Sequence, residues 1–418
     1  QQCFSKSSPR RIHAAPLRYF AMSGRCTQWS IEPSHRVGAF YLGMGVNEAL
    51  SIVQKMGSLD CAEFSFDEQH PFDVDLTLRL PSWGLQLCFD SYQQDLRLIS
   101  VRLQDDVERE RIVAEARPDL IYSGQKVTAM CLREVYQLFG PTWIGDFQHQ
   151  PPSYLLKYPG LAFEFPLQDM EAAVAKGEHP MDIAGSASFL WVFAAQASVQ
   201  SPCSAVPELL EAVSVLPGVG VSLQNRTLRF GAMPQDVVSD FGPPQQVCIK
   251  DVDAFRIHSA RAPSKSLDYY YNYFYLGLDA LFDGQTHLLQ KIVLHLNPPT
   301  HERFSRYTRC FFQLVLEDKD PDADAIDEAD PSHDATPPQR ACVDVRWQWP
   351  EIEEALCRVG LTKSKPLVMD QDGYTSFGST YFYGFPGLVF EVMQNGYLAS
   401  LTVFGVHGCR LPAAFERS

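Results

Sequence analysis

The sequence predicts an α+β protein built from about four copies of one module, each a short helix followed by antiparallel strands. The first observation is a helical stripe of apolar residues at i, i+3, i+4 and i+7, whose four copies begin at Val46, Leu132, Pro234 and Ile352. The second is a strand signature, Gly-Leu followed by alternating apolar residues, which begins at Gly84, Gly160, Gly277 and Gly387. Because the period changes from 3.6 to 2 within each module, each helix is expected to pack on a small sheet.

The helices and strands of a module depend on each other for burial. Each stripe covers about ten residues, too few for a helix that persists alone in water. Three of the stripes stop at Gly140, Gly242 and Gly360, because glycine ends a helix in the left-handed conformation at little cost. Alternation gives a strand one buried face, so each module must pack its strands on its own helix or on a neighbouring module.

The chain divides into seven predicted segments. In order, these are a basic, disordered N-terminal extension (1–30), a region with modules 1 and 2 (31–167), a connector or insertion (168–227), module 3 (228–316), an acidic disordered loop (317–341), module 4 (342–405) and a tail (406–418). A helix is expected at 206–215 in the connector, and a continuous strand at 269–282 in module 3.

The N-terminal extension leaves two interpretations open. Residues 1–30 are basic and contain no acidic residue, which is the composition of an organelle transit peptide. Alternatively, the segment lies upstream of a true start at Met22.

Composition excludes several classes of function. A net charge of −15 without a basic stripe argues against nucleic-acid binding. No run approaches the roughly 20 apolar residues of a membrane-spanning helix. The 11 cysteines are scattered, which predicts reduced thiols and no zinc site. No catalytic motif is present, so we predict no catalytic residue, metal ligand or cofactor. The histidines at 287, 295 and 301 are expected to have separate structural roles.

Aromatic residues are concentrated in one predicted strand. The stretch 269–275 reads Tyr-Tyr-Tyr-Asn-Tyr-Phe-Tyr. In a strand, one face takes Tyr269, Tyr271, Tyr273 and Tyr275, and the other takes Tyr270, Asn272 and Phe274. One set can enter the core, while the other is covered by another module or contacts a partner, where tyrosine is favoured.

Strings in and around this strand, and others near the C-terminus, carry a family resemblance. They are Asp268-Tyr269, Asn272-Tyr273-Phe274, Leu276-Gly277, Val293-Leu294-His295, Arg309-Cys310, Phe377-Gly378-Ser379-Thr380 and Phe390-Glu391-Val392-Met393-Gln394-Asn395. Together they resemble the phagosome assembly factor 1 family. The resemblance spans roughly residues 31–405, and it is dense after residue 228 and sparse between 105 and 225.

The resemblance implies a non-enzymatic cytosolic adaptor. Animal members of the family pair with a WD-repeat β-propeller protein and gather at sites of autophagosome formation, where phosphoinositides help to recruit the complex. Our candidate partner-contact residues come from the aromatic strand and from one of the strings above: Tyr269, Tyr271, Asn272, Tyr273, Phe377, Gly378, Ser379 and Thr380. The alternatives are a small-molecule or lipid-binding protein, or a cryptic enzyme, with a cleft between modules, and an organellar protein if residues 1–28 are a transit peptide.

Overall fold

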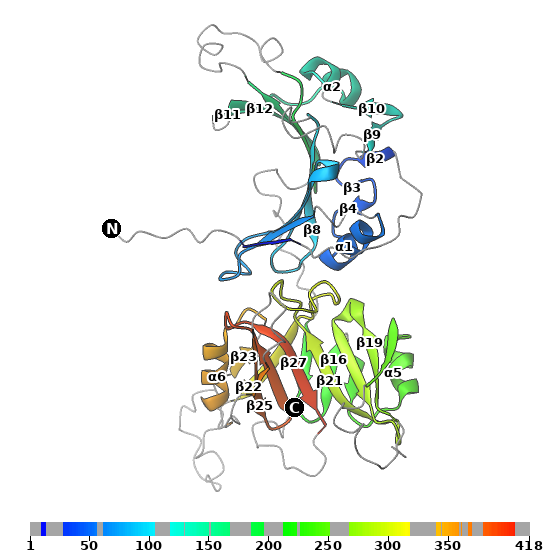
Figure 1. Cartoon of the computed structure of the whole chain (residues 1–418), viewed down its shortest axis with the longest axis vertical. Helices are drawn as coiled ribbons and strands as arrows, with labels where there is room; N and C mark the ends of the chain where they lie inside the picture. Colours follow the sequence, from blue (N-terminus) through cyan, green and yellow to red (C-terminus); the bar gives the residue numbers. More distant parts are fainter. Residues whose placement is uncertain are drawn as a thin grey trace, which may run out of the picture. The chain divides into compact units, whose positions relative to one another are not determined.

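The chain forms two compact units, unit 1 (residues 1–207) and unit 2 (residues 208–418), in a computed structural model (Figure 1). The structure describes residues 10–13, 28–56, 62–104, 118–128, 130–149, 152–167, 185–195, 212–223, 226–250, 267–317, 340–343, 345–358, 361, 367–369 and 379–405.

Each unit contains two modules with one order of elements: two or three short strands, a helix and a four-stranded antiparallel meander. Module 1 consists of β2 (Gln28–Glu32), β3 (Arg36–Val37), β4 (Phe40–Tyr41), α1 (Val46–Lys55), β5 (Glu63–Phe66), β6 (Leu76–Leu80), the 3₁₀ turn η2 (Pro81–Trp83), β7 (Leu85–Phe89) and β8 (Leu96–Arg102). Module 2 consists of β9 (Asp119–Tyr122), β10 (Gln125–Val127), α2 (Leu132–Phe139), β11 (Asp146–His149), β12 (Pro152–Tyr158), β13 (Leu161–Pro166) and β14 (Phe189–Phe193). A further strand, β1 (Arg10–His13), precedes module 1.

Unit 2 repeats this order. Module 3 consists of β15 (Val213–Leu216), β16 (Gly220–Leu223), β17 (Arg226–Arg229), α5 (Pro234–Phe241), β18 (Gln246–Ile249), β19 (Tyr269–Tyr273), the 3₁₀ turn η5 (Phe274–Leu276), β20 (Leu278–Phe282) and β21 (Leu289–His295). Module 4 consists of β22 (Phe312–Glu317), β23 (Arg340–Val343), α6 (Trp349–Arg358), β24 (Leu367–Met369), β25 (Thr380–Phe385), β26 (Leu388–Val392) and β27 (Leu398–Phe404). The prediction of an α+β protein with four antiparallel modules is confirmed.

The two modules of a unit join through equivalent strands. In unit 1, the large sheet has the order β1-β5-β6-β7-β8-β14-β13-β12-β11, and in unit 2 the order is β18-β19-β20-β21-β27-β26-β25-β24. The last strands of the two modules pair antiparallel in both units, β8 with β14 and β21 with β27. The first strands pair parallel within the smaller five-stranded sheets, β2 with β9 and β15 with β22. The units therefore share one topology.

The helices cover one face of each large sheet, as the apolar stripes predict. In Figure 1, α1 and the short strands β2–β4 lie on the same side of the nine-stranded sheet. Phe139 of α2 packs on Phe163 of β13, with ring centroids 5.0 Å apart. Trp349 of α6 stacks on Tyr383 of β25 at 4.0 Å. The packing of these aromatic rings fixes the helices on the sheets.

The glycines of the strand signature occupy one turn in all four modules. Gly84, Gly160, Gly277 and Gly387 each directly precede the third strand of the meander, and all have positive φ, between 63° and 78°. This left-handed conformation is strained for residues with a Cβ atom. The Gly-Leu signature is therefore a turn glycine followed by the first buried residue of the next strand.

Modules 1 and 3 also share the turn between their last two strands. Asp90 Oδ1 accepts hydrogen bonds from the N–H groups two and three residues later (2.8 and 2.6 Å), and Asp283 Oδ1 does the same (3.0 and 2.7 Å). The second oxygen of each carboxylate is bound by the residue seven positions later, Arg97 (3.1 Å) or Gln290 (3.2 Å). The match extends the repeat to individual hydrogen bonds.

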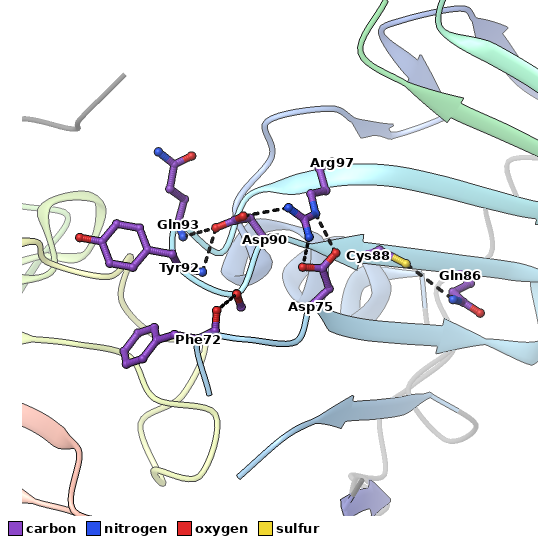
Figure 2. A network of polar contacts seen from close by, with 9 residues as sticks. Phe72, Asp75, Gln86, Cys88, Asp90, Tyr92, Gln93 and Arg97 are labelled. Atoms are coloured by element: carbon purple, nitrogen blue, oxygen red, sulfur yellow. Dashed lines mark hydrogen bonds and ion pairs between the residues drawn. The ribbon is translucent and has the colours of Figure 1, made fainter. Parts of the chain in front are cut away.

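Figure 2 shows the module 1 turn and the arginine that ties it to the sheet. Arg97 lies between two carboxylates: Nε donates to Asp75 Oδ2 at 2.7 Å, and Nη1 donates to Asp90 at 3.1 Å. The Ser91 hydroxyl donates to the carbonyl of Phe72 at 2.6 Å. Because these side chains are partly buried, the network fastens the turn to the loop before β6.

Asp95, a carboxyl group near this turn, lowers the stability of the folded state at neutral pH. Burial and the charge of Asp90 raise the pKa of Asp95 to about 6. A raised carboxyl pKa means that stability is lost as pH rises from 3.8 through about 6. Asp95→Asn should therefore raise the free energy of unfolding by about 1 kcal/mol at pH 7, because solvent screens part of the shift.

Urea unfolding at several pH values measures this effect. The difference between Asp95→Asn and the wild type should grow from near zero at pH 4 to its full value above pH 7. Asp73→Asn, which changes an exposed carboxyl, is the matched control and should give no such trend. A pH-independent difference for Asp95→Asn would contradict the assignment.

The structure corrects the predicted N-terminal extension. Residues 10–13 form β1, which pairs antiparallel with β5, and β2 begins at Gln28. Neither segment shows strong alternation in the sequence, and β1 is held by backbone pairing at a sheet edge. Of the other predicted segments, most of the acidic loop and the tail 406–418 lie outside the described residues.

The predicted connector or insertion at 168–227 contains the boundary between the two units, and its described parts contribute strands to both of them. It contains β14, which lies between β8 and β13 in the centre of the nine-stranded sheet, and β15, β16 and the start of β17. Residues 213–215, expected to be helical, belong to β15. The reason is that β14 is a continuous apolar run, Phe-Leu-Trp-Val-Phe, as in strands covered on both faces, and lacks the alternation on which the prediction relied.

Among the described residues, none of the helices is both long enough and apolar enough to span a bilayer.

Candidate functional site

An apolar surface lies at one edge of the eight-stranded sheet in unit 2. Val247 and Ile249 on β18 are 55% and 65% exposed. They pair directly with Tyr271 and Tyr269 on β19. Residues opposite each other in an antiparallel ladder lie on one face, so these four side chains form a continuous surface, which we call the edge cluster.

The tyrosines of the edge cluster are anchored on the core by one side of their rings. Phe282 of β20 is fully buried, and its ring centroid lies 5.5 Å from Tyr269 and 4.9 Å from Tyr271. The Tyr269 hydroxyl is 3.0 Å from His287 Nδ1. Burial and the neighbouring Tyr271 raise the pKa of Tyr269. Anchored, half-buried aromatic rings lose little entropy on binding, which suits a protein interface.

The remaining candidate contact residues have other positions. Asn272, Tyr273 and Thr380 are buried, at 4%, 1% and 2% exposure, so they cannot offer a surface to a partner. Ser379 is half-buried, and Phe377 and Gly378 lie outside the described residues. The Tyr273 hydroxyl donates to the carbonyl of Gly242 at 3.0 Å, which ties β19 to the end of α5.

The predicted strand at 269–282 is interrupted, which changes the faces of its aromatic residues. The strand β19 ends at Tyr273, and η5 and Gly277 form a turn before β20. Tyr275 therefore leaves the row of Tyr269, Tyr271 and Tyr273, and it is 49% exposed on η5. Alternation alone could not reveal the turn, because 3₁₀ turns of three residues leave no period in a sequence.

The opposite face of the eight-stranded sheet carries a buried polar network. Asp279 on β20 is the centre: its Oδ2 is 2.9 Å from His295 Nε2, and its Oδ1 accepts from Asn272 Nδ2 at 2.7 Å. The Tyr307 hydroxyl lies 3.0 and 2.8 Å from the two carboxylate oxygens. The rings of His295 and Tyr307 are stacked, with centroids 3.8 Å apart. Both oxygens of Asp279 therefore have donors.

These contacts determine the charge state of the network. Burial raises the pKa of Asp279, but the hydrogen bond and charge of His295, with the hydrogen bonds of Asn272 and Tyr307, outweigh it and hold the pKa below its ordinary value. Burial and the Asp279 charge raise the pKa of Tyr307. The carboxylate stays ionised and the phenol stays neutral, so the phenol acts as a donor.

A second buried pair lies on the same face in module 4. His301 Nε2 is 3.1 Å from Glu391 Oε1, and the Ser400 hydroxyl donates to Glu391 Oε2 at 2.6 Å. Burial raises the pKa of Glu391, but the hydrogen bond and charge of His301 dominate and lower it. Tyr307 and His301 both belong to residues 297–310, which we call the covering segment. It lies over the polar face and is fixed there by both networks.

The three histidines singled out in the sequence thus have three different partners. His287 contacts Tyr269, His295 contacts Asp279 and His301 contacts Glu391. Sequence reasoning missed the two carboxylates. Each is a single acid within an apolar strand signature, Asp279 after Gly277-Leu278 and Glu391 after Phe390, and no other feature of the sequence marks it.

Unit 1 presents an exposed apolar pair on a fastened loop. Trp143 and Ile144, between α2 and β11, are each 88% exposed. The loop is held on both sides of the pair: the Thr142 hydroxyl donates to a carbonyl of β12 at 2.6 Å, and the Gly145 N–H donates to the Tyr154 hydroxyl at 2.8 Å. Sequence reasoning did not single out this pair.

The fold and site define a class before any relative is considered: a four-module α+β protein with two large antiparallel sheets and exposed apolar residues at a sheet edge. The profile of the family described as "Phagosome assembly factor 1" matches residues 36–203 and 208–404. The chain belongs to the phagosome assembly factor 1 family, and the resemblance found in the sequence is confirmed.

Curated relatives are similar over nearly the whole chain. A PHAF1 protein of Arabidopsis thaliana is 32% identical over 430 residues, covering 96% of this chain and 99% of the relative. A PHAF1 protein of Drosophila melanogaster is 29% identical and covers 90% and 92% of the two chains. A PHAF1 protein of Caenorhabditis elegans is 25% identical and covers 87% and 90%. No solved structure matches the chain.

Proposed function

We propose that the protein is a non-enzymatic adaptor that assembles with a partner protein in phagosome or autophagosome formation. The observation that carries the proposal is the edge cluster, where two apolar side chains and two anchored tyrosines share one accessible face. The name of the family, phagosome assembly factor 1, supports an assembly role. The family resemblance points to a WD-repeat β-propeller protein as the partner.

The proposed place of action is the cytoplasm, with recruitment to preautophagosomal membranes and a role in vesicle transport. The partner complex, rather than a spanning segment of this chain, is proposed to make peripheral contact with phosphoinositides. The net charge of −15 supports this division, because an acidic chain gains little from anionic lipid by itself.

The absence of enzymatic activity is part of the proposal, and the buried networks support it. The Asp279 and Glu391 carboxylates are the groups most like acid–base residues, but their oxygens are engaged by histidine, tyrosine or serine. They lie beneath the covering segment, and their hydrogen bonds hold that segment on the sheet. Such pairs contribute fold specificity without needing a substrate.

Co-purification tests the adaptor function. The full chain, tagged and expressed in cells of its source, should enrich a WD-repeat protein over an unrelated tagged protein of similar charge. Mass spectrometry of the eluate identifies the partner. Recovery of no WD-repeat protein would overturn the partner assignment.

The edge cluster predicts which substitutions weaken that complex. Tyr269→Ala with Tyr271→Ala should weaken partner binding at least tenfold, because anchored tyrosines at the centre of an interface often contribute more than 1 kcal/mol each. Binding can be measured by titration with the purified partner.

A matched control separates binding from folding. Tyr122→Ala removes a tyrosine that stacks on Phe139 at 4.2 Å in unit 1, and it should leave partner binding unchanged. Circular dichroism checks that the double variant keeps its strand content. Unchanged affinity in a folded double variant would place the interface elsewhere.

A further inference from the structure

Among the strands that the structure describes, β18 ends the eight-stranded sheet, with β19 as its only neighbour. Its four residues, Gln246–Ile249, pair with β19 along one side. Edge strands are templates for pairing with another chain, and proteins commonly protect them with charge, proline or a covering strand. Here the edge bears Val247 and Ile249, which are more than half exposed. These two apolar side chains favour pairing with another strand, whereas charged residues or proline would oppose it.

The equivalent edge in module 1 shows how such a strand can be completed. Both β5 and β18 follow the helix of their module and are the first strands of the meander. In module 1 a further strand, β1, pairs antiparallel with β5 over four residues, Arg10 opposite Phe66 through His13 opposite Glu63. The chain itself therefore adds a short extended segment at this position of the module.

Register identifies the residues that correspond in the two edges. Phe64 pairs with Leu78, which pairs with Leu87, and Val247 pairs with Tyr271, which pairs with Ala280. Leu87 and Ala280 each lie three residues after the turn glycine of their module, so Phe64 corresponds to Val247. By the same count, Phe66 corresponds to Ile249.

Exposure differs sharply between the corresponding residues. Phe66, beside β1, is 2% exposed, whereas Ile249, at the edge, is 65% exposed. Burial of a side chain of this size stabilises a complex, because its apolar surface is removed from water. An added strand beside β18 would bring Ile249 toward the state of Phe66.

We propose that the β18 edge binds an extended segment of a partner protein as an added antiparallel strand. The segment carries apolar side chains at alternate positions, next to Val247 and Ile249, and an acidic residue near Lys250, which is exposed just beyond the strand. The ladder supplies main-chain hydrogen bonds and the edge cluster supplies side-chain selectivity. This inference rests on the proposed adaptor function and specifies how its partner is held.

A second copy of this chain fits the edge less well than a partner segment. Four residues of strand span about 13 Å. Two such edges paired together would bury far less than the roughly 1,200 Å² of a stable dimer. A flexible segment can bind the edge and also follow the faces of Tyr269 and Tyr271, so it gains area that two rigid sheets cannot share.

Peptide display on the full chain tests the proposal without the natural partner. A library of random ten-residue peptides is panned on the immobilised chain, and the most enriched peptide is synthesised. We expect alternating apolar residues in the enriched peptides.

Binding should be at least tenfold weaker to the double variant Val247→Lys and Ile249→Lys, because lysine is a natural blocker of edge strands. Val74→Lys with Met233→Lys, at residues 51% and 53% exposed and outside the strands, is the control and should bind normally.

Hydrogen exchange distinguishes strand addition from side-chain docking. The bound peptide should slow amide exchange at Gln246–Ile249 in the full chain, since the outward N–H groups gain acceptors. Absence of enrichment, equal binding to the edge variant, or unchanged exchange at β18 would each overturn the proposal. If a WD-repeat protein still co-purifies in that case, the adaptor function stands and only strand addition falls.

Discussion

Replacing Asp279 with alanine is expected to lower the free energy of unfolding of unit 2 by about 3–5 kcal/mol, the usual cost of removing one partner from a buried ionic pair. Three donors converge on this carboxylate: His295 Nε2 at 2.9 Å, the Tyr307 hydroxyl at 2.8 Å and Asn272 Nδ2 at 2.7 Å. Alanine leaves all three buried without their acceptor. It also releases the covering segment from β20.

Unfolding in urea, followed by amide exchange in β20 and β21, measures this loss within unit 2. Asp240→Asn is the matched control, because Asp240 is exposed in the last turn of α5, where a negative charge opposes the helix dipole. The control should change stability by no more than about 0.5 kcal/mol. A loss below about 1 kcal/mol for Asp279→Ala would mean that the network does not hold the covering segment.

The same carboxylate gives stability a defined pH dependence. The folded state lowers the pKa of Asp279 from its ordinary 3.8, so its contribution is present above that value and is lost as pH falls through the lower folded pKa. Glu391, also lowered, adds to the loss in acid. Asp279→Asn should reduce the slope of stability against pH below 4, whereas the control Asp240→Asn should keep it.

The repeat was the part of the fold that the sequence could reveal. Local rules place Val46, Leu132, Pro234 and Ile352 on helices, and they place a turn glycine before each buried leucine. These rules work because a short helix or strand with one buried face carries apolar residues at the spacing of that face. They fail for β1 and β14, which depend on neighbouring strands distant in sequence for their pairing.

The candidate site was only partly predictable, because exposure is decided by what covers a face. Tyr271 and Tyr273 lie on one face of β19 and look equivalent in the sequence. However, Tyr273 is 1% exposed beside the end of α5, whereas Tyr271 is only half-buried. The exposure of Val247 and Ile249 follows from the strand order of the sheet, and no local pattern contains that order.

The buried networks were beyond the reach of local patterns for a similar reason. The pairs His295–Asp279 and His301–Glu391 join residues 16 and 90 positions apart. Their formation requires the covering segment to lie across β20 and β26, and this depends on the pairing of β21 with β27. A polar residue on such a face is conspicuous only after the sheet has been assembled.

Replacing Gly277 with alanine is expected to destabilise unit 2 by about 3 kcal/mol or more, from two additive causes. The first is its φ of +65°, which costs a residue with a Cβ atom about 1–2 kcal/mol. The second is crowding: a Cβ atom would overlap the carbonyl oxygen of Thr308 and lie 2.9 Å from the Cβ of Cys310. Backbone atoms cannot move aside as a flexible side chain can.

Gly396→Ala separates these two causes. Gly396 has a φ of +83°, but an added Cβ would meet nothing within 4 Å. It should therefore cost only the conformational strain, about 1–2 kcal/mol. Urea unfolding of both variants measures the difference.

Equal losses would show that the covering segment does not pass as close to the turn as the structure places it. A larger loss at Gly277 would show that this glycine serves two purposes at once. It provides the positive φ before the third strand, as the equivalent glycine does in every module, and it admits the segment whose Tyr307 and His301 bind the buried carboxylates.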